Sequence, residues 1–158
     1  MSPAETVSID LAGAKVTIPS NTIAELWLAR LGKPSVAPKI ETPAPLFGAS
    51  LDGGFYAGVT LHDGVPKRLV LLPGDHKGTW DNARAWAAER DGELPSRIDQ
   101  LVLWQNMREQ FEQTWYWSSE QYAPDAGCAW CQDFTDGDQL SRHKSAELRA
   151  RAVRRLPL

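Results

Sequence analysis

The fold is decided by the stretch from Trp115 to Arg155, which contains WYWSSEQ (115–121), AWCQDF (129–134) and RARAVRR (149–155). Aromatic and aliphatic residues fill short runs of the length and composition that favour β-strands. Polar, turn-rich segments separate these runs. The stretch therefore predicts a compact β-sheet whose loops present Asp, Gln, Tyr and His side chains.

Two helices are predicted upstream of this sheet. The first follows Thr79, a candidate N-cap, and spaces Trp80, Ala83, Trp86 and Ala87 towards a core, before Gly92 ends it. The second begins near Leu94-Pro95-Ser96, where Ser96 and Asp99 have the spacing of a capping box. Along this helix Leu103, Met107 and Phe111 repeat every four residues. We expect Trp80, Trp86 and Trp104 to be core residues.

Two strands precede the helices, over residues 55–61 and 67–72, and His62-Asp63-Gly64 joins them as a turn. Short strands after two helices are typical of an α+β domain.

The first 46 residues have a different pattern. Apolar and polar residues alternate over 7–11 and 16–18, which predicts a β-hairpin, and a helix is expected from Ser20 to Leu31. Four prolines lie within 33–46 and indicate an extended connector. The predicted organisation is therefore an arm (1–32), a connector (33–46) and a domain (47–158). Because a hairpin and one helix bury little surface alone, we expect a homo-oligomer held through residues 7–31.

The motifs resemble a known family. YWSSE, AWCQDFTDG and RARAVRR, with TWDNARAWAAERDGELPSRIDQLVLW upstream, are similar to the blocks of the Lcl C-terminal-domain-like family, although Ser96 stands where that family usually has Thr. This family is a domain of unknown function found in bacterial proteins and in phage or prophage genes. The resemblance covers residues 47–158 and implies a C-type-lectin-like fold.

Composition limits the classes of partner. The net charge of −3 argues against a protein that wraps nucleic acid. Basic residues gather late in the chain, where we expect a solvated sheet face: Arg142, Lys144, Arg149, Arg151, Arg154 and Arg155. No signal peptide and no apolar run of the ~20 residues that span a bilayer is visible. We therefore expect a protein made in the cytoplasm without membrane insertion, with a virion as the other destination for a phage product.

Cys128 and Cys131 form a C-x-x-C motif, which suggests a redox dithiol or half of a zinc site. A zinc site needs four ligands, and a redox motif normally opens a helix, whereas this motif enters a predicted strand. Residues three apart in a strand point to opposite faces. We predict two free or structural thiols, no cofactor and no catalytic activity. A cysteine-dependent oxidase is the enzymatic alternative, because formylglycine-generating enzymes share this general fold and use paired cysteines.

Asp133, Asp136 and Asp138 surround Gly137. These residues suggest either a Ca²⁺ site or a polar turn with local hydrogen bonds. Their spacing does not match an EF-hand, and the Glu-Pro-Asn and Gln-Pro-Asp triplets of sugar-binding C-type lectins do not occur. We favour the polar turn.

The predicted loops 119–129 and 134–145 combine rigid aromatic residues with adaptable polar ones, as recognition loops do. His143 lies in the second loop, and we expect His62 and His76 in loops too. The predicted ligand-binding residues are Trp117, Gln121, Tyr122, Asp125, Asp136, Asp138, Gln139, Arg142, His143 and Lys144. We predict a non-catalytic phage or prophage module that binds a host protein or glycan. The alternatives are ordinary polar loops, or an intracellular phage accessory protein that inhibits a host defence by binding a protein or nucleotide.

Overall fold

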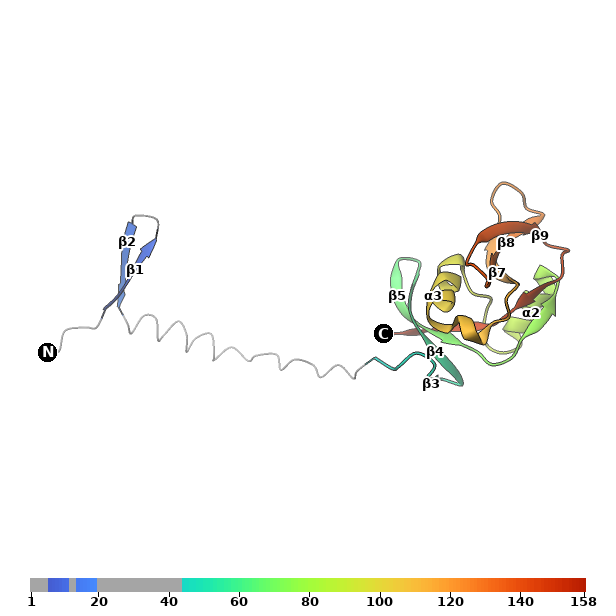
Figure 1. The fold of residues 1–158 in the computed structure, drawn as a ribbon, viewed down its shortest axis with the longest axis horizontal. Helices are drawn as coiled ribbons and strands as arrows, with labels where there is room; N and C mark the ends of the chain where they lie inside the picture. Colours follow the sequence, from blue (N-terminus) through green and yellow to red (C-terminus); the bar gives the residue numbers. More distant parts are fainter. Residues whose placement is uncertain (1–5, 12–13, 20–43) are drawn as a thin grey trace. The chain divides into compact units, whose positions relative to one another are not determined.

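The computed structural model describes residues 6–11, 14–19 and 44–158. The chain divides into two compact units, Met1–Ala44 and Pro45–Leu158 (Figure 1). Each unit is described separately.

In the first unit, strands β1 (Thr6–Leu11) and β2 (Ala14–Pro19) form an antiparallel two-stranded sheet. Its register pairs Val7 with Ile18 and Ile9 with Val16. The predicted hairpin is therefore confirmed. The predicted helix from Ser20 and most of the proline-rich connector lie outside the described residues.

The second unit is α+β, as predicted, with mostly antiparallel sheets and two helices. One sheet has the order β11-β5-β4-β3, and all its pairs are antiparallel. Its strands are β3 (Ser50–Leu51), β4 (Gly54–His62), β5 (Val65–Leu71) and β11 (Val153–Pro157). Asp63 and Gly64 form the β4–β5 turn with φ values of 50° and 74°. Both values match the left-handed backbone that an Asp-Gly hairpin turn requires, so the predicted turn is confirmed.

The second sheet has the order β6-β10-β7-β8-β9, and β10 pairs with β7 in parallel. Its strands are β6 (His76–Gly78), β7 (Trp115–Gln121), β8 (Cys128–Asp133), β9 (Gln139–His143) and β10 (Leu148–Ala150). Most of this sheet comes from the stretch 115–155, as the aromatic runs predict.

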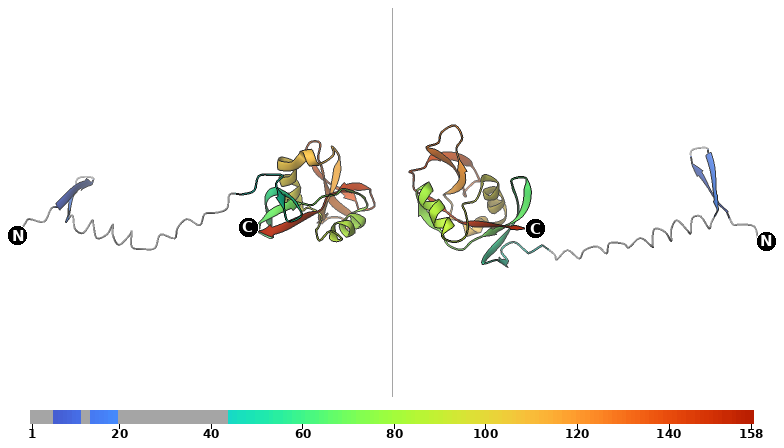
Figure 2. Two further views of the ribbon diagram at one scale, coloured as in Figure 1. Left: turned by 90° about the horizontal axis from the view of Figure 1, so that it is seen from below. Right: turned by 180° about the vertical axis from the view of Figure 1, so that it is seen from behind.

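Helices α2 (Trp80–Ala88) and α3 (Arg97–Met107) lie on different sides of the unit, with α3 beside the β4–β5 hairpin (Figures 1 and 2). The Ser96–Asp99 capping box is present with both hydrogen bonds. Thr79 takes the backbone geometry of an N-cap, but its side chain makes no cap hydrogen bond, contrary to the prediction. Neither helix, nor any other helix in the described ranges, has the length and apolarity needed to cross a membrane.

The α3 helix is shorter than predicted. It ends at Met107, and a 3-10 turn (Arg108–Gln110) separates it from Phe111. Phe111 is nevertheless buried, because its ring stacks on Phe134 with 3.9 Å between centroids. The four-residue repeat therefore identified a core residue but assigned it to the wrong element.

Within residues 45–158 the core consists of two clusters of buried side chains. The first includes Val70, Trp80 and Trp117, and the second includes Leu69, Leu103 and Tyr116. Leu69 and Val70 are consecutive in β5, so successive side chains of one strand serve different clusters. Trp80 is buried as predicted. Trp86 and Trp104 are half-buried and pack against the first and the second cluster, so full burial is confirmed for Trp80 alone.

The late arginines do not form the solvated face that the sequence suggested. Arg151 is 8% exposed, and only 5% of the Arg155 side chain is exposed. Arg155 pairs with Asp99 and Glu93, and Arg151 donates to the carbonyl oxygen of Gln110 over 2.6 Å. Arg155 lies in β11 and Arg151 lies between β10 and β11, and the fold brings both side chains beside these partners.

Candidate recognition surface

Two predicted loops are shorter than expected, because strands occupy part of each. β7 continues to Gln121 and β8 begins at Cys128, so the first loop is residues 122–127. The second predicted loop contains the whole of β9. The three histidines also lie in strands rather than loops, with His62 ending β4, His76 beginning β6 and His143 ending β9.

One predicted binding residue belongs to the core. Trp117 is 0% exposed, and its Nε1 donates to the carbonyl oxygen of Gly78 over 3.0 Å. It therefore cannot contact a ligand at the surface. The other nine predicted residues are exposed or half-buried and fall into separate groups.

The first group is organised by Trp80 at the start of α2. Nζ of Lys144 lies over the Trp80 ring at 4.3 Å from its centroid, and the Arg84 guanidinium lies over it at 4.6 Å. Lys144 also donates to Oε1 of Gln121 over 2.7 Å. The indole Nε1 of Trp80 donates to the carbonyl oxygen of Ser118 over 2.8 Å, which fixes the ring against β7. We call these four residues, Trp80, Arg84, Gln121 and Lys144, the Trp80 site.

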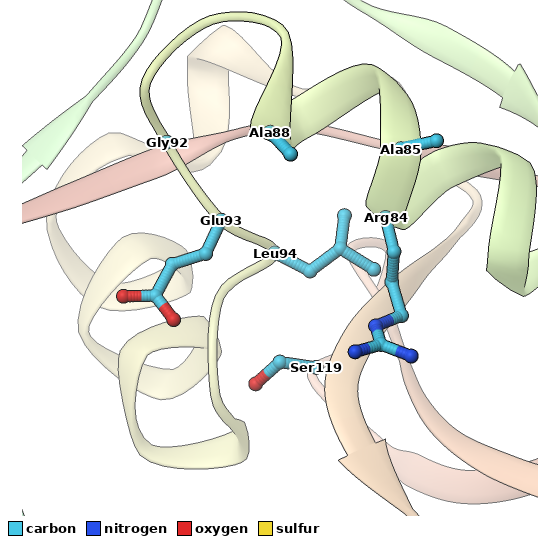
Figure 3. Close-up of a pocket in the computed structure, with 7 residues that line it drawn as sticks. All are labelled: Arg84, Ala85, Ala88, Gly92, Glu93, Leu94 and Ser119. Atoms are coloured by element: carbon cyan, nitrogen blue, oxygen red, sulfur yellow. The ribbon is translucent and has the colours of Figure 1, made fainter.

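A cavity of about 550 Å³ adjoins the Trp80 site through Arg84. Its walls are the outer side of α2, the segment 92–94 and Ser119 of β7. In Figure 3 the side chains of Arg84 and Leu94 point into the space between helix and strand, whereas Glu93 points away from Arg84. The cavity therefore combines apolar walls with a guanidinium, a hydroxyl and a carboxylate, and its size suits a small ligand or a few side chains.

None of the ten predicted binding residues lines this cavity. Sequence reasoning missed Arg84, Glu93 and Ser119. A signal existed for Arg84, because it lies four residues after Trp80 in the predicted helix and so is its neighbour on the helix surface. No comparable signal connects Glu93 with Ser119, since the two residues come together only through tertiary structure.

A second group surrounds Trp130 on β8. The Arg97 guanidinium lies over the Trp130 ring at 3.7 Å from its centroid, and Tyr122 meets the ring edge to face at 5.2 Å. Gln139 accepts from Nε of Arg97 over 3.0 Å and donates to the carbonyl oxygen of Arg97 over 2.9 Å. Glu120 accepts from the Arg97 backbone N–H over 2.8 Å. The predicted residue Gln139 is thus held by Arg97 at the start of α3, and Tyr122 by Trp130.

The loop 122–127 is organised by Asp125. Its carboxylate accepts from the Gly127 N–H over 2.8 Å and from the Cys128 thiol over 3.4 Å. These two hydrogen bonds, the first above all, lower the pKa of Asp125. His143 is the β9 partner of Cys128, and its Nδ1 lies 2.7 Å from Oγ of Ser145. The remaining predicted binding residue on β9, Arg142, is exposed, with its guanidinium 5.4 Å from the Trp115 ring centroid.

Asp136 and Asp138 lie in an exposed turn. The Asp136 carboxylate accepts from the Asp138 N–H over 3.0 Å, and Asp133 accepts from the Thr135 N–H over 2.8 Å. Such local bonds are those of the polar turn that the sequence favoured. Within residues 44–158, no three His, Cys, Asp or Glu side chains are arranged to hold a metal ion.

Both cysteines are free thiols in β8. Burial raises the pKa of Cys131 to about 12. Partial burial and the hydrogen bond to Asp125 raise the pKa of Cys128. Because the thiolate is the nucleophile and the metal ligand, these environments favour the unreactive thiol form. The sequence itself matches no protein-family model and none of the curated proteins.

Proposed function

We propose that residues 45–158 form a non-catalytic binding module with a C-type-lectin-like fold, encoded by a phage or prophage, that recognises a host protein or glycan. The α+β architecture and the resemblance of the sequence motifs support the fold. The raised pKa values of Cys128 and Cys131 support a role without a cysteine nucleophile. The ligand would occupy the Trp80 site and its adjoining cavity.

The observation that carries the proposal is the preorganised Trp80 site. Arg84 and Lys144 are held over one ring, and Lys144 is also held by Gln121, so their donors are ordered before a ligand arrives. Ordering side chains on binding costs about 0.5–1.5 kcal/mol for each long side chain, and this cost is avoided here. The cavity of about 550 Å³ supplies the concave, partly apolar wall that ligand sites require.

Two cations beside an aromatic ring favour ligands with carboxylate, phosphate or closely spaced hydroxyl oxygens. Acidic glycans and acidic segments of proteins both supply such groups. The groups around Trp130 and Asp125 would contribute further contacts, because Trp130 lies on β8, which pairs with the β7 strand that carries Gln121, and Asp125 lies in the loop between these two strands.

The test is binding of the labelled full chain to an array of neutral and acidic bacterial glycans and to intact bacterial cells. The double variant Arg84→Ala, Lys144→Ala is expected to lose at least tenfold in affinity. A second variant, with Tyr122, Asp136, Asp138 and His143 changed to Ala, measures the contribution of the predicted loops.

The matched control is Arg108→Ala, which removes another exposed arginine from another tryptophan, since the Arg108 guanidinium lies 5.7 Å from the Trp104 ring centroid. It should bind as the unmodified chain does. Circular dichroism checks that all variants are folded. Unchanged binding by both the double variant and the loop variant would contradict the proposal.

A further inference from the structure

Most edge strands of the two sheets in residues 44–158 carry the features that prevent edge-to-edge association. β9 contains Arg142, β11 contains Arg154, Arg155 and Pro157, and the three-residue β6 contains Lys77. Charged residues, prolines and short length all discourage another strand from pairing with an exposed edge. These edges are therefore protected.

The edge of β4 is different. β3 has only two residues and pairs with Gly54 and Phe55 at the start of β4, and residues 48–49 extend the bonding only to Tyr56. From Gly58 to His62, β4 pairs with β5 on one side and with no other strand in the described part of the chain. This run, GVTLH, contains no Lys, Arg, Asp, Glu or Pro. It is an unprotected edge of five residues.

The side chains of this run have distinct faces. Oγ1 of Thr60 donates over 2.5 Å to the buried carboxylate of Asp99 on α3, so Thr60 points into the unit. Because side chains alternate along a strand, Val59 and Leu61 share the opposite face. They are 48% and 53% exposed. The free edge is thus bordered by two apolar side chains in water.

We propose that the free edge of β4 pairs antiparallel with the same edge of a second copy of this chain. A two-fold axis at Thr60 sets Gly58 opposite His62 of the second copy, and Val59 opposite Leu61 of the second copy. Both Val59–Leu61 pairs then lie on the exposed face and cover each other. The run carries no formal charge, so the two-fold arrangement brings no like charges together.

The self-complementarity of residues 58–62 favours a second copy of this chain as the partner at the free edge of β4. An extended segment of another protein can also add to a sheet edge, but its side chains would have to match the same short, neutral pattern. An interface formed by five residues of each copy is small, and proteins with small interfaces associate weakly. The dimer is therefore expected to form at roughly micromolar to millimolar chain concentration.

Sedimentation velocity of the full chain over increasing concentration tests the pairing, with Leu61→Lys as the variant. Leu101→Lys is the matched control, because Leu101 is 49% exposed, similar to Leu61, but lies on α3. The unmodified chain and the control are expected to show the same rise in mean mass with concentration. Leu61→Lys should keep the mass of a single chain at every concentration.

Cross-linking gives a second readout that does not depend on the folding of the lysine variant. In a Cys128→Ser background, chains with Val59→Cys are mixed with chains with Leu61→Cys and oxidised. Directly opposite residues have Cα atoms within disulfide range, whereas diagonal neighbours lie at about 7–8 Å. The mixture should therefore form disulfide-linked dimers, and each variant alone should not.

Three results would each overturn the inference. The first is a full chain that stays monomeric at every concentration, and the second is a cross-link yield that does not depend on mixing. The third is association that Leu61→Lys leaves intact, which would assign self-association to another surface, residues 7–31 among them. Binding of a different protein at this edge, with no self-association, counts as the first result.

Discussion

At the scale of single residues, the most constrained group is the buried carboxylate of Asp99. It is 0% exposed and accepts hydrogen bonds from Thr60 and from the Ser96 N–H, in addition to its ion pair with Arg155. A buried carboxylate is tolerated only when it is paired and hydrogen-bonded. Asp99 therefore connects α3 to β4 and to β11 at one point.

Asp99→Asn tests this connection. The amide has the same shape but no charge, so it leaves Arg155 with one carboxylate partner, the half-exposed Glu93. Breaking a buried ion pair on one side costs about 3–5 kcal/mol, and we expect a loss near the lower end because Glu93 remains. Urea unfolding measures it. Glu147→Gln, an exposed control, should change the free energy of unfolding by less than about 0.5 kcal/mol.

The buried thiol and phenol predict a dependence on alkaline pH. Burial raises the pKa of Cys131 from 9.0 to about 12 and that of Tyr116 from 10.0 to about 12. Both groups hold their protons more tightly in the folded chain. Their stabilising contribution is complete below about pH 9 and declines as the pH rises towards 12.

The free energy of unfolding of the unmodified chain should therefore fall between pH 9 and 11. In Cys131→Ala the fall should be smaller, because the thiol that ionises on unfolding is gone, even though the variant is less stable at neutral pH. Urea titrations at several pH values measure both quantities. An identical fall in Cys131→Ala would mean that this thiol already ionises near pH 9 in the folded chain.

At the scale of elements, substitutions of two turn glycines distinguish the cost of backbone strain from the cost of side-chain packing. Gly64 has φ +74° and no neighbour within 4 Å of the place where a Cβ would stand. Gly137 has φ +90°, and the Trp104 ring lies 3.1–3.3 Å from the corresponding point. Gly64→Ala should cost about 1–2 kcal/mol from strain alone. Gly137→Ala should cost roughly 1–3 kcal/mol more, since the indole must move.

Thermal unfolding of the two glycine variants gives the comparison directly. Equal losses would show that Trp104 moves freely, and would mean that it does not fix the turn 134–138. A shift of the Trp104 indole N–H signal in the NMR spectrum of Gly137→Ala, absent in Gly64→Ala, is the expected spectroscopic sign of the contact.

Elements with a strong apolar pattern could be predicted from the sequence, and edge elements could not. The aromatic run of β7 and the Ser96 capping box are local signals, and both identified their elements. β9 reads Gln-Leu-Ser-Arg-His, where only Leu140 packs against the core, because an edge strand has one neighbour and meets solvent. The sequence of β9 therefore resembles that of a loop. For this reason the predicted boundaries of the second recognition loop were wrong.

At the scale of the whole molecule, the unit Pro45–Leu158 contains both buried clusters of the core. A chain that starts at Pro45 is therefore expected to fold, with a free energy of unfolding within about 1 kcal/mol of the full chain. Chemical denaturation measures this difference. A large loss of stability would mean that residues 1–44 contribute to the same cooperative unit.

The same truncation tests the predicted assembly through residues 7–31. If that arm holds an oligomer, light scattering should show a lower mass for the chain that starts at Pro45. If only the β4 edge associates, the two chains should behave alike. An unchanged mass would contradict the prediction for the arm.

Long-range partners are the part of the molecule that local patterns could not predict. Arg155 lies 56 residues from Asp99, and Arg154 lies 102 residues from the Asp52 carboxylate that it binds over 2.8 Å. A cluster of arginines in sequence resembles a solvated face, because nothing local indicates which acids the fold will bring near. The cavity beside Arg84 was missed for the same reason.

The position of β11 has a consequence for the order of events during synthesis. This strand, Val153–Pro157, completes the sheet beside β5 and supplies the counter-ion of Asp99. Until residue 157 leaves the ribosome, the nascent chain has an unpaired β5 edge and a buried acid without its cation. The unit should therefore close only after residues 153–157 have been synthesised and have left the ribosome.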